Sequence, residues 1–216
     1  MQRQFDLIVF DWDGTLMDSI GKIIACVEKL AEHISVPVPE DEAIRAIIGL
    51  SLSEALATLF PEVDMPPSMM TQVYQHQFKH VELMPTPLFT GVESLLQQLT
   101  AQGYTLAVAT GKSRAGLDAC FERTALSHYF AASRCSDECA GKPHPQMLQE
   151  LLAQLAVAPE RAVMVGDSRL DIQMGNKAGM ATIAVTYGAQ TPALLALEQP
   201  TAMVDSIAQL GQWLLQ

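Results

Sequence analysis

Short apolar runs, separated by stretches with helical spacing, constrain the fold of this chain most strongly. Consecutive apolar residues without polar alternation are typical of strands that are buried on both faces. Such runs, or weaker strand signals, occur at residues 6–10, 105–109, 131–134, 162–165, 182–185 and 202–204. The segments between most of them carry apolar residues at the three- and four-residue spacing of amphipathic helices. We therefore predict an α/β fold, with a Rossmann-like parallel sheet core and helices on both faces.

The segment 17–84 interrupts this alternation, because it contains no convincing strand. Its helical spacing begins after Ser19, a residue type that suits an N-cap, and continues to about residue 80 with breaks at prolines. We expect a small all-helical domain at 17–84, inserted into a discontinuous α/β core that comprises 1–16 and 85–216.

Composition and charge exclude several classes of function. The chain has 216 residues, of which 49% are hydrophobic and 17% charged, as in ordinary globular proteins. Its formal net charge is −11 and no run of lysines or arginines occurs, which argues against nucleic acid or an anionic membrane as a partner. The sequence has neither a membrane-spanning apolar stretch nor a signal-peptide pattern, so we expect a cytoplasmic protein, either monomer or homodimer.

Two carboxylates, Asp11 and Asp13, directly follow the first predicted strand. Carboxylates at the end of a buried strand repel each other and resist desolvation, so a positive or reactive group is expected between them. In parallel sheets, ligands bind beyond the carboxyl ends of the strands. Further candidates for binding or catalysis follow the other strands or precede a helix at this edge. They are Thr110, Gly111, Lys112, Lys142, Asp167 and Asp171.

Four segments of the sequence, in order, carry a resemblance to a known family. FDWDGTLMDS, ATGKS, GKPHP and VGDSRLDIQMGNKAG resemble the four motifs of the haloacid dehalogenase superfamily of phosphohydrolases. The helical insertion resembles the small cap domain that many phosphoglycolate phosphatase-like members carry at this point. With the cap, the resemblance covers nearly the whole chain.

The resemblance implies a catalytic role for each of three residues. Asp11 occupies the family's nucleophile position and would form an aspartyl-phosphate intermediate. Asp13 would protonate the leaving oxygen and then take a proton from the hydrolytic water. Lys142 would supply positive charge to the transferring phosphoryl group. Thr15 is expected to fix the turn rather than to touch substrate.

The resemblance also implies a Mg²⁺ cofactor, which would offset the repulsion between the acids. Its implied ligands are the side chains of Asp11 and Asp167 and the backbone carbonyl of Asp13. Asp171 is either a further ligand or a supporting residue behind the ligands, and we favour the supporting position because magnesium usually keeps several waters.

Thr110 and the backbone N–H of Gly111 are expected to hold phosphoryl oxygens at a helix N-terminus. Many relatives carry asparagine at the position of Gly111, so here only the amide is retained. For Lys112 two roles are open, a contact with phosphate or exposure to solvent.

Arg45 and Ser51, on either side of Gly49 in RAIIGLSLSEA, are candidates for reading a carboxylate or hydroxyls of the substrate. The alternative for this stretch is a helix break with a capping serine.

We therefore predict a magnesium-dependent phosphatase that hydrolyses a small phosphorylated metabolite, either a phosphoglycolate-like acid or a sugar phosphate. A phosphotransferase or phosphomutase of the same superfamily is the alternative, because it would use the same residues. A non-catalytic binding protein would be expected to have lost Asp11 or Asp13, and a dehalogenase would not need Asp13.

Overall fold

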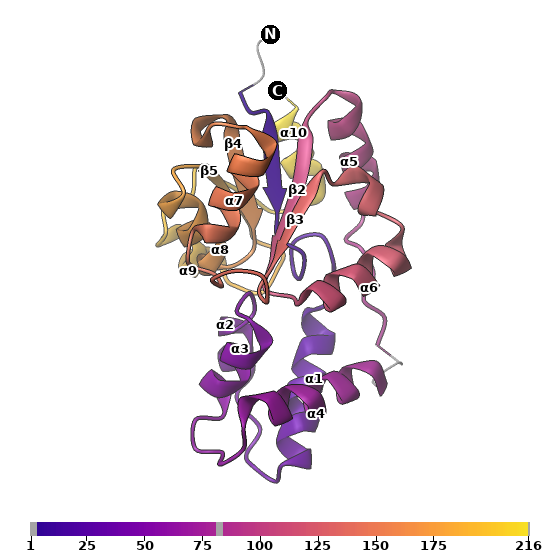
Figure 1. Cartoon of the computed structure of the whole chain (residues 1–216), viewed down its shortest axis with the longest axis vertical. Coiled ribbons are helices and arrows are strands. Elements are labelled where there is room, and N and C mark those ends of the chain that lie inside the picture. The colour runs from indigo at the N-terminus through magenta and orange to yellow at the C-terminus, as the bar shows by residue number, and fades with distance from the viewer. Residues whose placement is uncertain (1–3, 81–83, 216) are drawn as a thin grey trace.

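A six-stranded parallel sheet forms the core of the computed structural model, which describes residues 4–80 and 84–215 (Figure 1). The strands lie in the order β3-β2-β1-β4-β5-β6, and each neighbouring pair is parallel. Their bounds are Leu7–Phe10 (β1), Thr105–Thr110 (β2), Ala132–Cys135 (β3), Ala162–Gly166 (β4), Ala181–Val185 (β5) and Ala202–Val204 (β6). The predicted α/β fold with a Rossmann-like parallel sheet is confirmed.

Helices cover both faces of this sheet. One face packs against α5 (Val92–Ala101), α6 (Arg114–Thr124) and α10 (Ile207–Leu214). The opposite face packs against α7 (Gln146–Leu155) and α8 (Arg169–Lys177), with the short α9 (Pro192–Ala196) beside α8. Short 3₁₀ turns precede β3 and β4.

The run LIVF of β1 shows why such strands lack polar alternation. Ile8 and Phe10 belong to the apolar cluster on the face of α5 and α10, whereas Leu7 and Val9 belong to the cluster under α7. All four side chains are buried, because both faces of the sheet are covered. Phe10 is in register with β2 on one side and β4 on the other, so the next residue along the chain enters the central part of the carboxyl edge.

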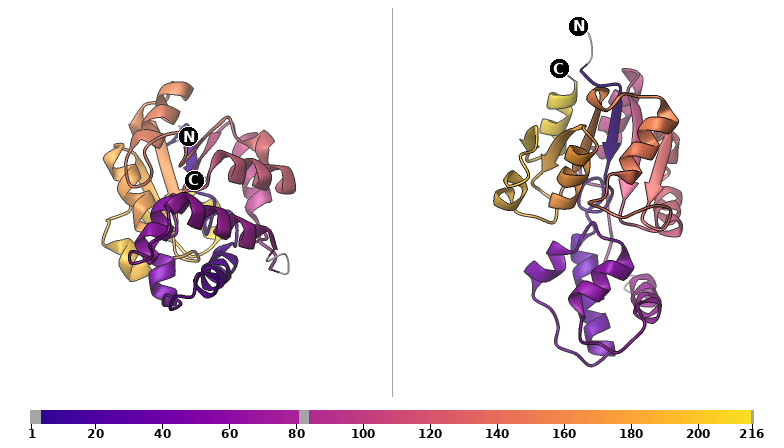
Figure 2. Two further views of the ribbon diagram at one scale, coloured as in Figure 1. Left: turned by 60° about the horizontal axis from the view of Figure 1, so that its bottom comes forward. Right: turned by 60° about the vertical axis from the view of Figure 1, so that its left-hand side comes forward.

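Four helices between β1 and α5 form a second unit beyond this edge (Figure 1 and the right-hand view of Figure 2). They are α1 (Ile20–His33), α2 (Asp41–Ala46), α3 (Leu52–Leu59) and α4 (Pro67–His80). A separate apolar cluster, which includes Leu30, Ile44 and Leu56, holds them together. The boundaries 17–84 stay a prediction, and residues 81–83 within them lie outside the described residues.

The chain enters and leaves this helical unit along two adjacent segments. Met17 and Leu88 form an antiparallel bridge. The Asp18 amide donates to the carbonyl of Pro87 (2.8 Å), and the Phe89 amide donates to the carbonyl of Leu16 (3.0 Å). The helical unit is therefore attached to the core through a short hydrogen-bonded neck.

One local expectation differs from the structure. Ser19 stands at the N-cap position of α1, but its side chain does not cap the helix, because its hydroxyl donates to Asp13 instead. Helix α8 begins two residues before Asp171, since Ser168 caps it. In residues 4–80 and 84–215, no helix is long and apolar enough to cross a membrane.

Candidate active site

Asp11 extends β1 into the carboxyl edge of the sheet. Its amide donates to the carbonyl of Val165 on β4 (2.9 Å), which continues the strand pairing by one residue. Its side chain is almost fully buried. A strand end that is paired in this way fixes the backbone of the predicted nucleophile.

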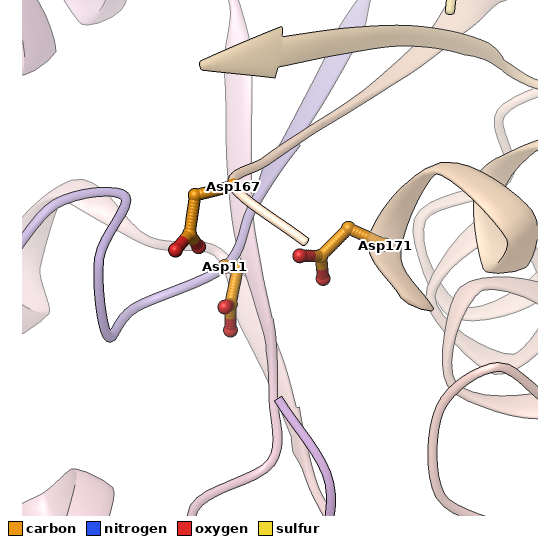
Figure 3. A group of neighbouring side chains, drawn as sticks. All are labelled: Asp11, Asp167 and Asp171. Atoms are coloured by element: carbon orange, nitrogen blue, oxygen red, sulfur yellow. The ribbon is translucent and has the colours of Figure 1, made fainter. Parts of the chain in front are cut away.

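Asp11, Asp167 and Asp171 bring their carboxylates together (Figure 3). Each offers one oxygen, and these oxygens lie within 4.8 Å of one another. The three residues come from the end of β1, the end of β4 and the first turn of α8. The sheet topology therefore brings Asp11 together with two acids that lie more than 150 positions away in the sequence.

Lys142 lies between two of these acids. Its Nζ is 2.7 Å from Asp11 Oδ1 and 2.6 Å from Asp171 Oδ1, and its side chain has no exposed surface. Burial alone would lower the pKa of Lys142, but the charges of Asp11 and Asp171 outweigh burial and raise this pKa above its usual value. The lysine is therefore a permanent cation at neutral pH.

The acid cluster still carries more negative charge than one lysine balances. Burial raises the pKa of Asp11 to about 7, with Lys142 opposing the rise and Asp171 adding to it. Burial, together with the charges of Asp11 and Asp171, raises the pKa of Asp167 well above its usual value. These raised pKa values show that ionising all three carboxylates beside one ammonium is costly. The fully ionised cluster would have an excess of two negative charges, which a divalent cation would match. A donor set made of carboxylate oxygens suits a hard cation such as Mg²⁺.

Asp167 is oriented by donors on both of its oxygens. Thr15 Oγ1 donates to Oδ1 (2.9 Å), and the Ala189 amide donates to Oδ2 (2.7 Å). Gly14, at a φ of 78°, turns the chain here, and a Cβ at this position would collide with Asp167 Oδ2. The expectation for Thr15 covered only the turn and missed its bond to Asp167.

Asp171 takes part in the capping box of α8. Its Oδ2 accepts from the amide (3.1 Å) and the hydroxyl (2.6 Å) of Ser168, while its own amide donates to Ser168 Oγ (3.4 Å). With Lys142 at Oδ1, its two oxygens already receive three contacts. Ser168, which orients this acid, was not among the predicted site residues, although a serine three residues before an acid is a capping-box pattern.

Asp13 lies at the rim of the cluster, and its side chain is 15% exposed. Ser19 Oγ donates to its Oδ1 (2.5 Å), and Lys112 Nζ lies 2.7 Å from its Oδ2. From the sequence, two roles were open for Lys112, a phosphate contact or exposure to solvent. In the structure, Lys112 is ion-paired with Asp13. Burial lowers the pKa of Lys112, but Asp13 raises it further, so that the net shift is upward.

Thr110 is the last residue of β2, and Gly111 begins the turn that follows. Thr110 is buried, and its Oγ1 accepts from the Lys112 amide (3.2 Å). A Cβ on Gly111 would lie 2.5 Å from the carbonyl oxygen of Gly49 and 2.6 Å from that of Leu50. The helical unit therefore closes directly onto this turn, and an asparagine side chain at position 111 has no room while the loop stays there.

The two cap candidates are placed differently. Ser51 caps α3, accepting from the Glu54 amide (3.4 Å) and donating to Glu54 Oε2 (2.5 Å). This is the capping role considered for it from the sequence. Arg45 lies in the last turn of α2, and its side chain forms no hydrogen bond or ion pair with another residue in the described part of the chain. Substrate contacts by either residue stay predictions.

Comparison with known proteins agrees with this arrangement. Residues 8–185 match the family model of haloacid dehalogenase-like hydrolases. The chain belongs to this family. It is 36% identical over 209 residues to a protein of Dickeya dadantii named "Probable phosphatase IndB", covering 94% of this chain and 91% of the relative.

Other relatives cover similar shares of the chain. A phosphoglycolate phosphatase of Vibrio vulnificus is 28% identical over 97% of this hydrolase and 96% of the relative. The solved structure of a haloacid dehalogenase-like family hydrolase from Streptococcus pneumoniae superposes with a TM-score of 0.84 at 25% identity, over 97% of this chain and 98% of that one. The predictions of the family and of a phosphatase enzyme are confirmed, whereas the metal, the substrate and the residue roles stay predictions.

Replacing Lys142 by methionine is expected to lower the turnover of phosphate esters by about 10²–10³ while the fold is kept. Methionine keeps much of the apolar stem but leaves Asp11 and Asp171 without their cation. Steady-state phosphate release and circular dichroism measure the two effects. Lys29→Met, on the exposed side of α1, controls for the change in net charge. Retention of more than a tenth of turnover by a folded Lys142→Met protein would contradict the role.

Replacing Gly111 by alanine is expected to lower kcat/KM about tenfold or more, because the new methyl group overpacks against the carbonyls of Gly49 and Leu50 at a cost of about 1–3 kcal/mol. Gly21→Ala, in α1, is the control, since its Cβ would meet only Met84 Cε at an ordinary 3.8 Å. Equal kcat/KM in the Gly111→Ala and Gly21→Ala proteins would show that the close approach of the cap carbonyls to Gly111 does not affect catalysis.

Proposed function

We propose that this hydrolase is a magnesium-dependent phosphatase that acts on a small phosphorylated metabolite through an aspartyl-phosphate on Asp11. The observation that carries the proposal is the placement of Asp11. It ends the central strand, lies beside the buried Lys142, and belongs to a carboxylate cluster with excess negative charge. Such a carboxylate can attack a phosphate dianion only where cations offset the charge of both partners.

We propose that the side chains of Asp11 and Asp167 and the backbone carbonyl of Asp13 hold the metal ion. Asp171 is assigned the supporting position, because its two oxygens already take three contacts, one of them from an ammonium. Thr15 and the Ala189 amide would keep Asp167 in position. When bound, Mg²⁺ supplies positive charge to the acids and to the phosphoryl oxygens.

In the first half-reaction, an oxygen of Asp11 attacks phosphorus, and the bond from phosphorus to the alcohol oxygen breaks. Asp13 enters this step carrying a proton, in contrast to its ion pair with Lys112 in the free enzyme. It donates this proton to the leaving oxygen, so the alcohol departs neutral and Asp13 becomes ionised. Thr110 Oγ1 and the Gly111 amide hold phosphoryl oxygens, and Lys142 offsets their charge.

In the second half-reaction, a water molecule attacks phosphorus of the aspartyl-phosphate. Asp13 takes one proton from this water, and the bond from phosphorus to the Asp11 oxygen breaks. Inorganic phosphate leaves, and both aspartates return to their initial states.

The proposed substrate class follows from the helical cap, taken as residues 17–84. Its loop at Gly49 and Leu50 lies against the catalytic turn, and a lid at this distance favours small esters over proteins or nucleic acid. The name of the Vibrio vulnificus relative supports a phosphoglycolate-like acid, and a sugar phosphate is the other member of the proposed class. We further propose a cytoplasmic location, which the free cysteines support.

Asp11→Asn is expected to reduce phosphate release to background, because the amide is a poor nucleophile and places no charge beside Lys142. The assay is a panel of phosphorylated small acids and sugars in the presence of Mg²⁺. Asp18→Asn, an exposed acid in the same segment, is the matched control. Substantial turnover by pure Asp11→Asn protein, with deamidation excluded by mass spectrometry, would refute the assignment. Transfer of phosphate to another sugar, instead of its release, would favour a mutase.

Magnesium is expected to stabilise the fold as well as to activate the enzyme, because it binds the native acid cluster and relieves repulsion. At a metal concentration about 100-fold above Kd the midpoint of thermal unfolding should rise by about 5–10 °C. Scanning calorimetry with Mg²⁺ and after chelation measures the shift. Asp167→Asn should abolish most of it. Full activity after exhaustive chelation would contradict the metal requirement.

A further inference from the structure

Lys22 of the helical cap is a cation in a position that is electrostatically unfavourable. It lies in the first turn of α1, where the helix dipole disfavours positive charge. Its side chain is half-buried, and within residues 4–80 and 84–215 it has no acidic partner. The contact that it makes is with an aromatic ring, since its Nζ lies 4.5 Å from the ring centre of Phe78 on α4.

The position of Lys22 on α1 directs it toward the catalytic edge. Ser19, three residues earlier, donates to Asp13, and residues three apart on a helix lie on the same face. Lys22 and the group that would protonate the leaving oxygen therefore lie on the same side of the cap.

The Phe78 ring joins this cap lysine to the core. Lys112, ion-paired with Asp13, has its Nζ 5.8 Å from the centre of the same ring. Tyr74, stacked on Phe78 one turn away, has a pKa that burial raises strongly, with the charges of Cys26 and Asp13 as further causes. The Phe78 ring is therefore approached by one ammonium from the core, which is paired with Asp13, and by another from the cap.

The two lysines differ in whether an acidic side chain neutralises their charge. The charge of Lys112 is matched by Asp13. The charge of Lys22 has no acidic counterpart among the described residues, so it can serve a ligand. On another side of the cap, Glu54 Oε2 lies only 3.2 Å from where a Cβ of Gly141 would be. A ligand anion is repelled from the Glu54 side and attracted to the Lys22 side.

We propose that Lys22 determines specificity by binding a carboxylate on the alcohol part of the substrate, so that the enzyme selects phosphorylated small acids over neutral phosphate esters. One free ammonium matches one carboxylate in charge, and the group would be held beside Asp13, where the leaving alcohol departs. This inference rests on the proposed phosphatase function and chooses within its substrate class.

The test compares two esters that differ in this one group, 2-phosphoglycolate and 2-hydroxyethyl phosphate. For each, kcat/KM is measured with Mg²⁺ in the wild-type, Lys22→Met, Lys22→Arg and Lys29→Met proteins. Methionine keeps the packing on Phe78 without the charge, and arginine keeps the charge. Lys29→Met makes the same charge change two turns further along α1, on an exposed side chain.

We expect the wild-type enzyme to prefer the acid, and Lys22→Met to lower the ratio of the two kcat/KM values about tenfold to a hundredfold, the scale of one charged hydrogen bond. Lys22→Arg should keep most of the ratio, and Lys29→Met all of it. Glycolate should also inhibit the hydrolysis of p-nitrophenyl phosphate less in Lys22→Met than in the wild type. This second measurement does not depend on which ester is the better substrate.

An unchanged ratio in a folded, active Lys22→Met protein would overturn the inference and leave the phosphatase function standing, as would a wild-type preference for the neutral ester. If Lys22→Met does not fold, Lys22→Gln replaces it in the same comparison. Failure of the wild-type enzyme to hydrolyse any phosphate ester would instead overturn the proposed function.

Discussion

The burial of three carboxylates beside a single ammonium sets the conditions that the rest of the site must satisfy. Lys142 cannot be removed without stranding two of these acids, and it cannot neutralise all of them. The other hydrogen bonds that the carboxylate oxygens of the cluster accept come from neutral donors. Examples are the Thr15 hydroxyl and the Ala189 amide, which both donate to Asp167. These donors fix geometry without changing the charge, which leaves the excess available to a divalent ion and a phosphate ester.

The sequence allowed the sheet and the chemistry of its edge to be predicted, because both depend on local patterns. LIVF followed by an acid already indicates a buried strand with a reactive end. The contacts that orient Asp167 were missed because they join distant segments. Thr15 and Asp167 are 152 positions apart, and nothing near either residue indicates the other. Likewise, Ser19 suits a helix cap by local rules, and only the tertiary structure shows that its hydroxyl turns to Asp13.

Gly111 illustrates how a departure from a family pattern acquires a physical meaning. In the sequence it is only a missing asparagine. In the structure it is the point where two carbonyls of the cap approach the catalytic turn too closely for any side chain. The absence of a side chain at position 111 and the close approach of the cap therefore go together, and a variant that places asparagine there must also move the loop at Gly49.

The neck between the core and the helical unit determines how much conformational entropy the insertion costs the core. Met17 and Leu88 form a β-bridge, and hydrogen bonds lie on either side of it. With respect to the core, the segment between these two residues is therefore a single loop whose ends are held together. The entropy of closing a loop grows only with the logarithm of its length, and doubling the length adds about 0.6 kcal/mol. The same carboxyl edge can therefore carry inserts of very different size, at a cost to the core that rises by only about this amount with each doubling.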